Sequence, residues 1–217
     1  EGSTREAIFE CESSLEKRDM GLPSCMALIF FHSKCASPDQ DAISDLTRRS
    51  STEASKASES SKVLTSYFLT LTGDFDKARE LLSRLESSGS LAVSNARGWL
   101  EFYAGRAAAA AAPGKGSNAH LERLEKCMSC FDAAAGNGND LVNLDALMGK
   151  AKVLEGKRQW QQALECLNKV IVMHPFYLPA LIEKAKTLMM TADWDQALES
   201  ASRIQQQEPN NIEALRL

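Results

Sequence analysis

The stretches that decide the fold are LDALMGKAKVLEGKRQWQQALECLNKVIVMHPFY, from Leu144 to Tyr177, and LPALIEKAKTLMMTADWDQALESASRIQQQEPNN, from Leu178 to Asn211. Each is 34 residues long, a period typical of two-helix repeats. The pairs that agree are Leu147 and Leu181, Ala151 and Ala185, Leu154 and Leu188, Trp160 and Trp194, Ala163 and Ala197, Leu167 and Ala201, Val170 and Ile204, and Pro175 and Pro209. Each stretch therefore holds two apolar stripes at helical spacing, split by a short polar turn.

Eight residues are expected to hold these two repeats together: Ala151, Trp160, Ala163 and Pro175, and then Ala185, Trp194, Ala197 and Pro209. The alanines mark the places where the helices of a pair approach closely, and a bulky residue there would cost about 1–3 kcal/mol. The tryptophans are expected to fill the wedge at the turn as core residues. The prolines cannot continue a helix, so they end the second helix of each repeat.

Capping residues predict where helices begin. Asp193 with Gln196 has the spacing of a capping box for a second helix, and Asn210 with Glu213 has the same spacing for the helix that follows.

The repeat frame extends upstream to Leu69, Phe75 and Ala78, and further to Cys127 and Phe131. The predicted divisions are a partial repeat (helix B) at 1–21, a degenerate repeat with a Ser-rich end at 22–58, a repeat at 59–90, a repeat with an Ala/Gly-rich insertion near 106–119 at 91–143, repeats at 144–177 and 178–211, and the start of a further repeat at 212–217. We expect an all-α, right-handed superhelical solenoid of antiparallel helix pairs, the tetratricopeptide-repeat architecture. Since both ends fall inside a repeat, we expect a segment of a longer protein.

Composition narrows the function classes. The net charge of −4 and a pI near 5.5 argue against nucleic-acid binding, because Arg48-Arg49 is the nearest thing to a basic run. The apolar run from Met26 to Phe31 is far shorter than the ~20 residues of a spanning helix, so no direct membrane insertion is expected. Six cysteines without dense regular spacing are typical of a reducing compartment.

Residues that could carry chemistry are few. Cys127 and Cys130 form a CxxC, which on a helix places both sulfurs on one side, but no second CxxC or close His pair accompanies it. His32 and Cys35 lack an Asn or Asp in a recognisable arrangement. Gly136–Asp140 is typical of a turn rather than a phosphate loop. We therefore predict no catalytic, cofactor-binding or metal-binding residues, and a protein that is not an enzyme.

Binding is the remaining class of function. The first helices of a solenoid line a groove that takes a partner's helix or tail. A carboxylate clamp would require Lys, Arg and Asn at fixed first-helix positions, which here hold Asp145, Met148, Gly149, Lys152, Pro179, Ile182, Glu183 and Lys186. Two lysines among apolar and acidic residues argue against an adaptor that binds chaperone tails.

The joint order of several motifs resembles one family. These motifs are Ala42-Ile43 through Phe75-Asp76-Lys77-Ala78-Arg79-Glu80, Gly136–Asp140, Leu147-Met148-Gly149-Lys150-Ala151, Asp193-Trp194-Asp195-Gln196 and Asn211-Ile212-Glu213-Ala214-Leu215-Arg216. Together they resemble the N-terminal part of the tetratricopeptide repeat protein 21 family, the large tetratricopeptide-repeat subunit of intraflagellar transport complex A.

The resemblance implies a structural scaffold that supports retrograde ciliary transport and the ciliary entry of membrane proteins. It implies a location in the cilium or flagellum and the basal body, on the cytoplasmic side. It implies partners among the other complex A subunits, including those with propeller domains. It also implies cargo and neighbouring transport trains as partners. Two alternatives remain open: a generic tetratricopeptide adaptor (a co-chaperone or a ligase-complex scaffold) that binds partner helices or tails, and an enzyme that uses its cysteines.

Overall fold

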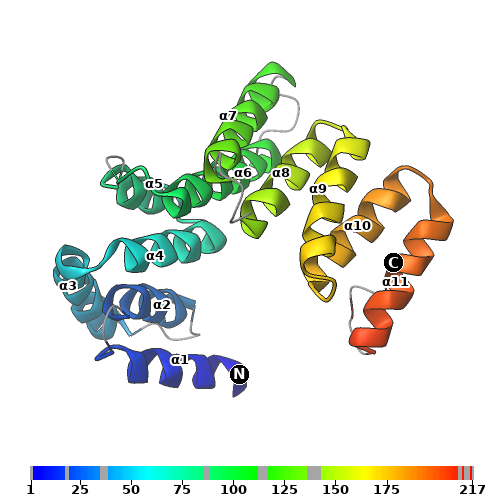
Figure 1. The fold of residues 1–217 in the computed structure, drawn as a ribbon. Coiled ribbons are helices and arrows are strands. Elements are labelled where there is room, and N and C mark those ends of the chain that lie inside the picture. Colours follow the sequence, from blue (N-terminus) through cyan, green and yellow to red (C-terminus); the bar gives the residue numbers. More distant parts are fainter. Residues whose placement is uncertain are drawn as a thin grey trace. The chain divides into compact units, whose positions relative to one another are not determined.

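Helices are the regular elements of this protein. A computed structural model describes residues 2–17, 20–34, 39–85, 88–111, 117–135, 143–209, 212 and 216. The helices are α1 (Gly2–Ser14), α2 (Gly21–Lys34), α3 (Gln40–Lys56), α4 (Glu59–Thr72), α5 (Phe75–Ser83), α6 (Leu91–Ala111), α7 (Ser117–Ala135), α8 (Leu144–Gly156), α9 (Trp160–Met173), α10 (Leu178–Met190) and α11 (Trp194–Gln207) (Figure 1). The described residues form no strand, and the all-α repeat fold expected from the sequence is confirmed.

The chain forms two compact units, Glu1–Ala112 and Pro113–Leu217. In the first unit α2 pairs with α3 and α4 with α5, while α2, α4 and α6 pack side by side in succession and α1 packs on α2. Its core includes Val63 and Leu69 of α4, Leu82 of α5, and Ala96 and Leu100 of α6. Burial of one apolar stripe from each helix therefore joins successive pairs into a continuous core.

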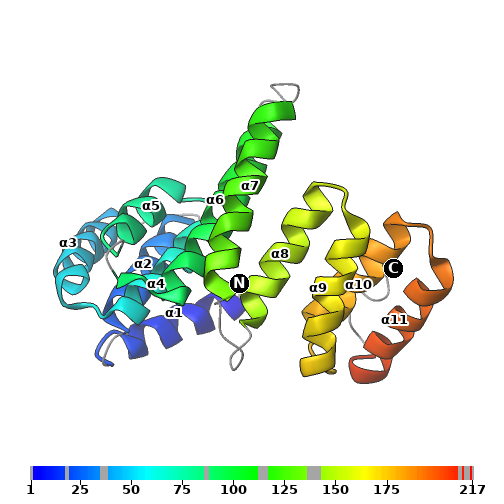
Figure 2. The same cartoon turned by 45° about the horizontal axis from the view of Figure 1, so that its top comes forward.

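The second unit repeats the pairing with α7 to α11. Helix α7 packs on α8, α8 pairs with α9, α9 also contacts α10, and α10 pairs with α11 (Figure 2). Its buried side chains include Phe131 of α7, Leu167 and Val170 of α9, Leu181 of α10 and Ile204 of α11. Each of the ranges 22–58, 59–90, 91–143, 144–177 and 178–211 thus contains two helices.

Local capping starts α11 where the sequence predicts. The Asp193 carboxylate accepts a hydrogen bond from the Gln196 backbone N–H at 3.3 Å, and the Gln196 side-chain amide donates to the same carboxylate at 2.7 Å. The Gln196 side chain therefore hydrogen-bonds the Asp193 side chain within this cap. The partner prediction for Asn210 with Glu213 lies outside the described residues, as do the turn Gly136–Asp140 and Cys35.

Three turns between paired helices share a left-handed residue. Gly73 has φ 88°, and Arg158 and Ala192 both have φ 59°. Each stands two positions before the aromatic residue that begins the second helix, which is Phe75, Trp160 or Trp194. Glycine adopts this conformation without the steric cost that a Cβ carries, so Gly73 suits the turn better than its two counterparts.

Two low-complexity stretches, one rich in Ala and one rich in Ser, are largely helical among the described residues. The polyalanine run extends α6 through the exposed Ala107 to Ala111, and α7 begins at Ser117, so helix extensions occupy much of the expected insertion at 106–119. The Ser-rich stretch from Ser50 to Ser61 is divided between the end of α3 and the start of α4, where Ser58 caps α4. Alanine propensity and a serine cap favour helix in both places.

One predicted core residue is wrong. The four repeat alanines (Ala151, Ala163, Ala185 and Ala197) are buried, and Pro175 and Pro209 lie in the turns just after α9 and α11. Trp160 is half-buried, but Trp194 is 62% exposed. The difference has a simple reason: α10 packs on α9, whereas no helix among the described residues follows α11 to cover the equivalent face.

Candidate protein-binding surface

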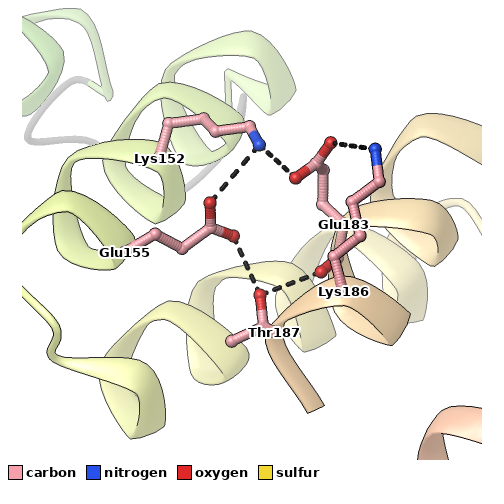
Figure 3. Close-up of polar contacts among 5 residues, drawn as sticks. All are labelled: Lys152, Glu155, Glu183, Lys186 and Thr187. Atoms are coloured by element: carbon pink, nitrogen blue, oxygen red, sulfur yellow. Dashed lines mark hydrogen bonds and ion pairs between the residues drawn. The ribbon is translucent and has the colours of Figure 1, made fainter. Parts of the chain in front are cut away.

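A polar network joins the first helices of two successive pairs in the second unit. It consists of Lys152 and Glu155 of α8 with Glu183, Lys186 and Thr187 of α10, and we call it the inter-repeat network (Figure 3). The two helices belong to the two 34-residue repeats, and they bring together residues that are about thirty positions apart. The network lies where a solenoid would present its groove.

The geometry of the network pairs each charge with an opposite one. Lys152 forms ion pairs with Glu183 and, at 3.3 Å, with Glu155. Lys186 pairs with Glu183 at 3.4 Å. The Thr187 hydroxyl lies 2.9 Å from a Glu155 oxygen and 2.8 Å from the Glu183 carbonyl, so one hydroxyl hydrogen serves two acceptors. Two lysines thus balance two glutamates, and the network is formally neutral.

Neutrality limits what this surface can bind. A C-terminal carboxylate approaching Lys152 would meet Glu155 and Glu183, which already accept that lysine's hydrogen bonds. Of the other first-helix positions, Met148, Gly149 and Ile182 are buried, while Asp145 and Pro179 are exposed. The surface therefore lacks the unpaired cations that a tail carboxylate needs.

The repeat pattern of the sequence pointed to Lys152, Glu183 and Lys186 as first-helix positions, but not to Glu155 and Thr187. A signal was present, because Lys152 with Glu155 and Glu183 with Lys186 are both i,i+3 pairs of opposite charge on predicted helices. The ion pair between Lys152 and Glu183, which joins the two helices, could not be predicted from such spacing. It depends on the packing of α10 beside α8.

A second feature, in the first unit, is a cleft between α1, α2 and α3. It encloses about 680 Å³ and is lined in part by Glu12, Leu28, His32 and Leu46. Arg48 at its rim pairs with Asp45 at 2.8 Å. Arg49 also pairs with an acidic residue, Glu16. Both arginines of the basic run noted in the sequence therefore have acidic partners.

Arg49 joins α3 to the segment after α1. Its guanidinium donates a hydrogen bond to Glu16 at 2.8 Å. That hydrogen bond is the main reason that the pKa of Arg49 is raised further above its ordinary value, although burial opposes the rise. The hydrogen bond thus links α3 to the residues after α1 beside the cleft, which Arg49 also lines.

The cysteines do not gather into a chemical site among the described residues. Cys127 of the CxxC is buried on α7, and Cys130 one turn later is half-buried. No group of three or more His, Cys, Asp or Glu side chains that could hold a metal ion occurs within the described ranges. Burial raises the pKa of Cys11, Cys25 and Cys166, which lowers the reactivity of their thiols.

In the part of the chain that the structure describes, none of the helices is both long enough and apolar enough to cross a bilayer.

Similarity to known proteins runs along the whole chain. The family model described as the tetratricopeptide repeat protein 21 N-terminal ARM repeat matches residues 1–198. Tetratricopeptide repeat protein 21B is 34% identical in Homo sapiens and 32% identical in Mus musculus, in both cases over 100% of this chain. Tetratricopeptide repeat protein 21A of Homo sapiens is 29% identical over 98% of this chain. The chain spans 15% of the length of each of these three relatives.

Proposed function

We propose a scaffolding function from one premise: the chain belongs to the tetratricopeptide repeat protein 21 family. The function is that of a structural, protein-interaction part of intraflagellar transport complex A. It supports retrograde ciliary transport and the entry of membrane proteins into the cilium. The observation that carries the proposal is the family match over residues 1–198, together with 34% identity across the whole chain.

The fold supports a role in holding other proteins. Stacked helix pairs expose a long surface relative to their core, and they use it for binding rather than for chemistry. The proposed partners are the other complex A subunits, including those with propeller domains, and then cargo and neighbouring trains. The proposed location is the cilium and basal body, on the cytoplasmic side. The proposed function includes no catalytic activity.

The inter-repeat network favours this role over that of a co-chaperone. A co-chaperone adaptor would use lysines on the first helices to hold a terminal carboxylate. Lys152 is instead paired with Glu155 and Glu183. We therefore propose that partners bind through shape and side-chain packing rather than through a charged tail.

The test is affinity purification of the tagged full-length protein from ciliated cells. The proposal expects the propeller-containing subunits of complex A to co-purify, and expects the tagged protein at the basal body and along the cilium. A loss-of-structure variant completes the test. Gly149→Leu would disrupt the repeat core, because even a Cβ at this position overlaps the Phe131 ring. This variant should lose the partners that pack against the second unit.

Recovery of chaperones or ubiquitin-ligase subunits without any complex A subunit would overturn the proposal. That outcome would favour the generic adaptor.

A further inference from the structure

The turn between α9 and α10 exposes a group of large apolar side chains. Val172 is 80% exposed, Met173 38%, Phe176 79% and Tyr177 36%. We call these four residues the α9–α10 patch. Figures 1 and 2 show the turn that carries it, which joins the end of α9 to the start of α10 within the second unit.

The next repeat shows that the end of such a helix forms without apolar residues there. Moving 34 residues along the chain, the four positions of the patch hold Gln206, Gln207, Asn210 and Asn211. Both helices end in the same way: the His174 N–H donates to the Val170 carbonyl at 2.8 Å, and the Glu208 N–H donates to the Ile204 carbonyl at 2.9 Å. The same helix end thus forms with polar side chains.

The exposed area is worth a sizeable free energy to a partner. Covering Phe176, which is 79% exposed, would remove most of an aromatic side chain's roughly 150–250 Å² from water, at about 25 cal/mol per Å². Tyr177, at 36% exposed, would add a smaller area. Aromatic side chains are also over-represented among residues that dominate binding energy. An apolar cluster that its own repeat does not use is therefore suited to intermolecular contact.

A lysine gives the patch a charge preference. Lys169 lies three residues before Val172 and four before Met173, on the same face of α9. It is exposed and forms no ion pair with any described residue. A partner that buries the patch would gain by presenting a carboxylate to this ammonium group.

We propose that the α9–α10 patch binds a protein segment that presents apolar side chains beside an Asp or Glu. One lysine in a chain of net charge −4 does not suit an anionic membrane surface, which attracts clusters of basic residues. The patch covers a few hundred Å² at most, less than the ~800 Å² per partner of a stable complex, so binding of a short segment should be micromolar. The proposal is independent of the ciliary assignment, since it needs only a protein partner.

The test uses the chain's own polar version of the turn. The double variant Phe176→Asn/Tyr177→Asn copies Asn210 and Asn211. Tyr177 is the N-cap of α10 and makes no side-chain capping hydrogen bond, whereas Asn is a favoured cap, so the new cap should offset part of the packing that the Tyr177 side chain loses. Circular dichroism at the assay temperature should show the double variant fully folded. Met190→Gln is the control, because Met190 is also exposed but lies at the other end of α10.

The probe is a phage-displayed library of 16-residue peptides selected on the whole chain. We expect enrichment of peptides that combine Leu, Phe or Trp with Asp or Glu. The best peptide, synthesised and titrated, should bind the double variant at least tenfold more weakly and Met190→Gln unchanged. Lys169→Glu should weaken it severalfold, and changing the peptide's acidic residue to Lys should restore binding to that variant.

Three results would overturn the proposal. In the first, the selected peptides bind the double variant as tightly as the unmodified chain. In the second, vesicles of phosphatidylserine and phosphatidylcholine sediment the unmodified chain but not the double variant, which would make the patch a membrane contact. In the third, the unmodified chain dimerises in sedimentation velocity and the double variant does not. Failure of complex A to co-purify would affect only the scaffolding function, because the library contains no ciliary protein.

Discussion

Individual residues decide how closely the helices of this chain approach. Gly149 of α8 lies so near the Phe131 ring of α7 that a Cβ at position 149 would overlap it. Phe131 is fully buried, so its ring could move only by displacing other core atoms. In the next repeat the equivalent position holds Glu183, a member of the inter-repeat network. The same repeat position thus serves a packing contact in one repeat and an ion pair in the other.

Gly149→Ala should lower the free energy of unfolding by about 1–3 kcal/mol, because the added methyl group forces the buried ring to shift. Thermal and urea melts followed by circular dichroism would measure the loss. Gly156→Ala on the same helix is the matched control. There the new Cβ meets only Leu124 side-chain atoms, at 3.3 Å, and the gain in helix propensity offsets the contact. Equal effects of the two substitutions would contradict the packing argument.

Cys166 should react slowly with alkylating reagents. Burial raises the pKa of its thiol, and Lys169 and Lys150 only partly oppose that rise. At pH 8 the folded chain therefore holds less thiolate at this position than the unfolded chain, and reaction with iodoacetamide should be slower when folded. Peptide mass spectrometry over a pH series, with and without urea, would measure the rates.

The same shift makes a prediction about stability. Between the thiol pKa of the unfolded chain, about 8.5, and the raised value of the folded chain, the unfolded state binds fewer protons, so stability falls as pH rises. Cys166→Ala should reduce that slope. An unchanged slope would assign the alkaline loss to other groups.

At the scale of elements, the turns repeat more faithfully than their residue types. Gly73, Arg158 and Ala192 share a left-handed backbone, although only the first is a glycine. The tryptophans illustrate the opposite case: Trp160 and Trp194 are the same residue at the same repeat position. Only the helix that Trp160 begins, α9, has a following helix packed on it among the described residues. The residue type at a repeat position therefore does not by itself determine whether the side chain is buried.

Ala192→Gly should raise the free energy of unfolding, by up to about 1 kcal/mol, since it removes the cost of a Cβ at φ 59°. Gly73→Ala should lower it by about the same amount, because nothing but the backbone conformation opposes a Cβ there. Melts of both variants under the same conditions would test the pair. If Ala192→Gly destabilised the chain as a glycine inside a helix does, the shared turn geometry would be wrong.

The extended ends of α6 and α7 show how far local propensity reaches. Alanine is the best helix former, and the exposed Ala107 to Ala111 continue α6 without burying a face. The run could be predicted as helix from composition, and Pro113 and Gly114 lie beyond its end. What propensity did not predict is that α7 would begin as early as Ser117.

At the scale of the whole molecule, the chain is two units, and within each unit a helix packs on its nearest helices along the stack rather than on all the others. The stability of such a chain is approximately a sum of repeat and interface contributions. Local damage should therefore stay mostly local.

Ala163→Leu should show this locality. Ala163 is fully buried where α9 packs on α8, and overpacking there should cost about 1–3 kcal/mol. Hydrogen exchange followed by mass spectrometry should show the largest loss of protection in α8 and α9, a smaller loss in α10, and little change in residues 39–85. Ala109→Leu, at an exposed position of α6, is the control and should change nothing. A uniform loss across all helices would mean that the chain unfolds as one cooperative body.

The sequence by itself determined the helical class, the 34-residue period and the capped start of α11, because periodicity and caps act within a few residues of the backbone. It also indicated the family, through the order of motifs along the chain. Only the tertiary structure decided which side chains meet between repeats: Phe131 against Gly149, Lys152 against Glu183, and the α9–α10 patch against solvent. Such contacts depend on how helices far apart in sequence stack, and on what covers each face, which no local pattern specifies.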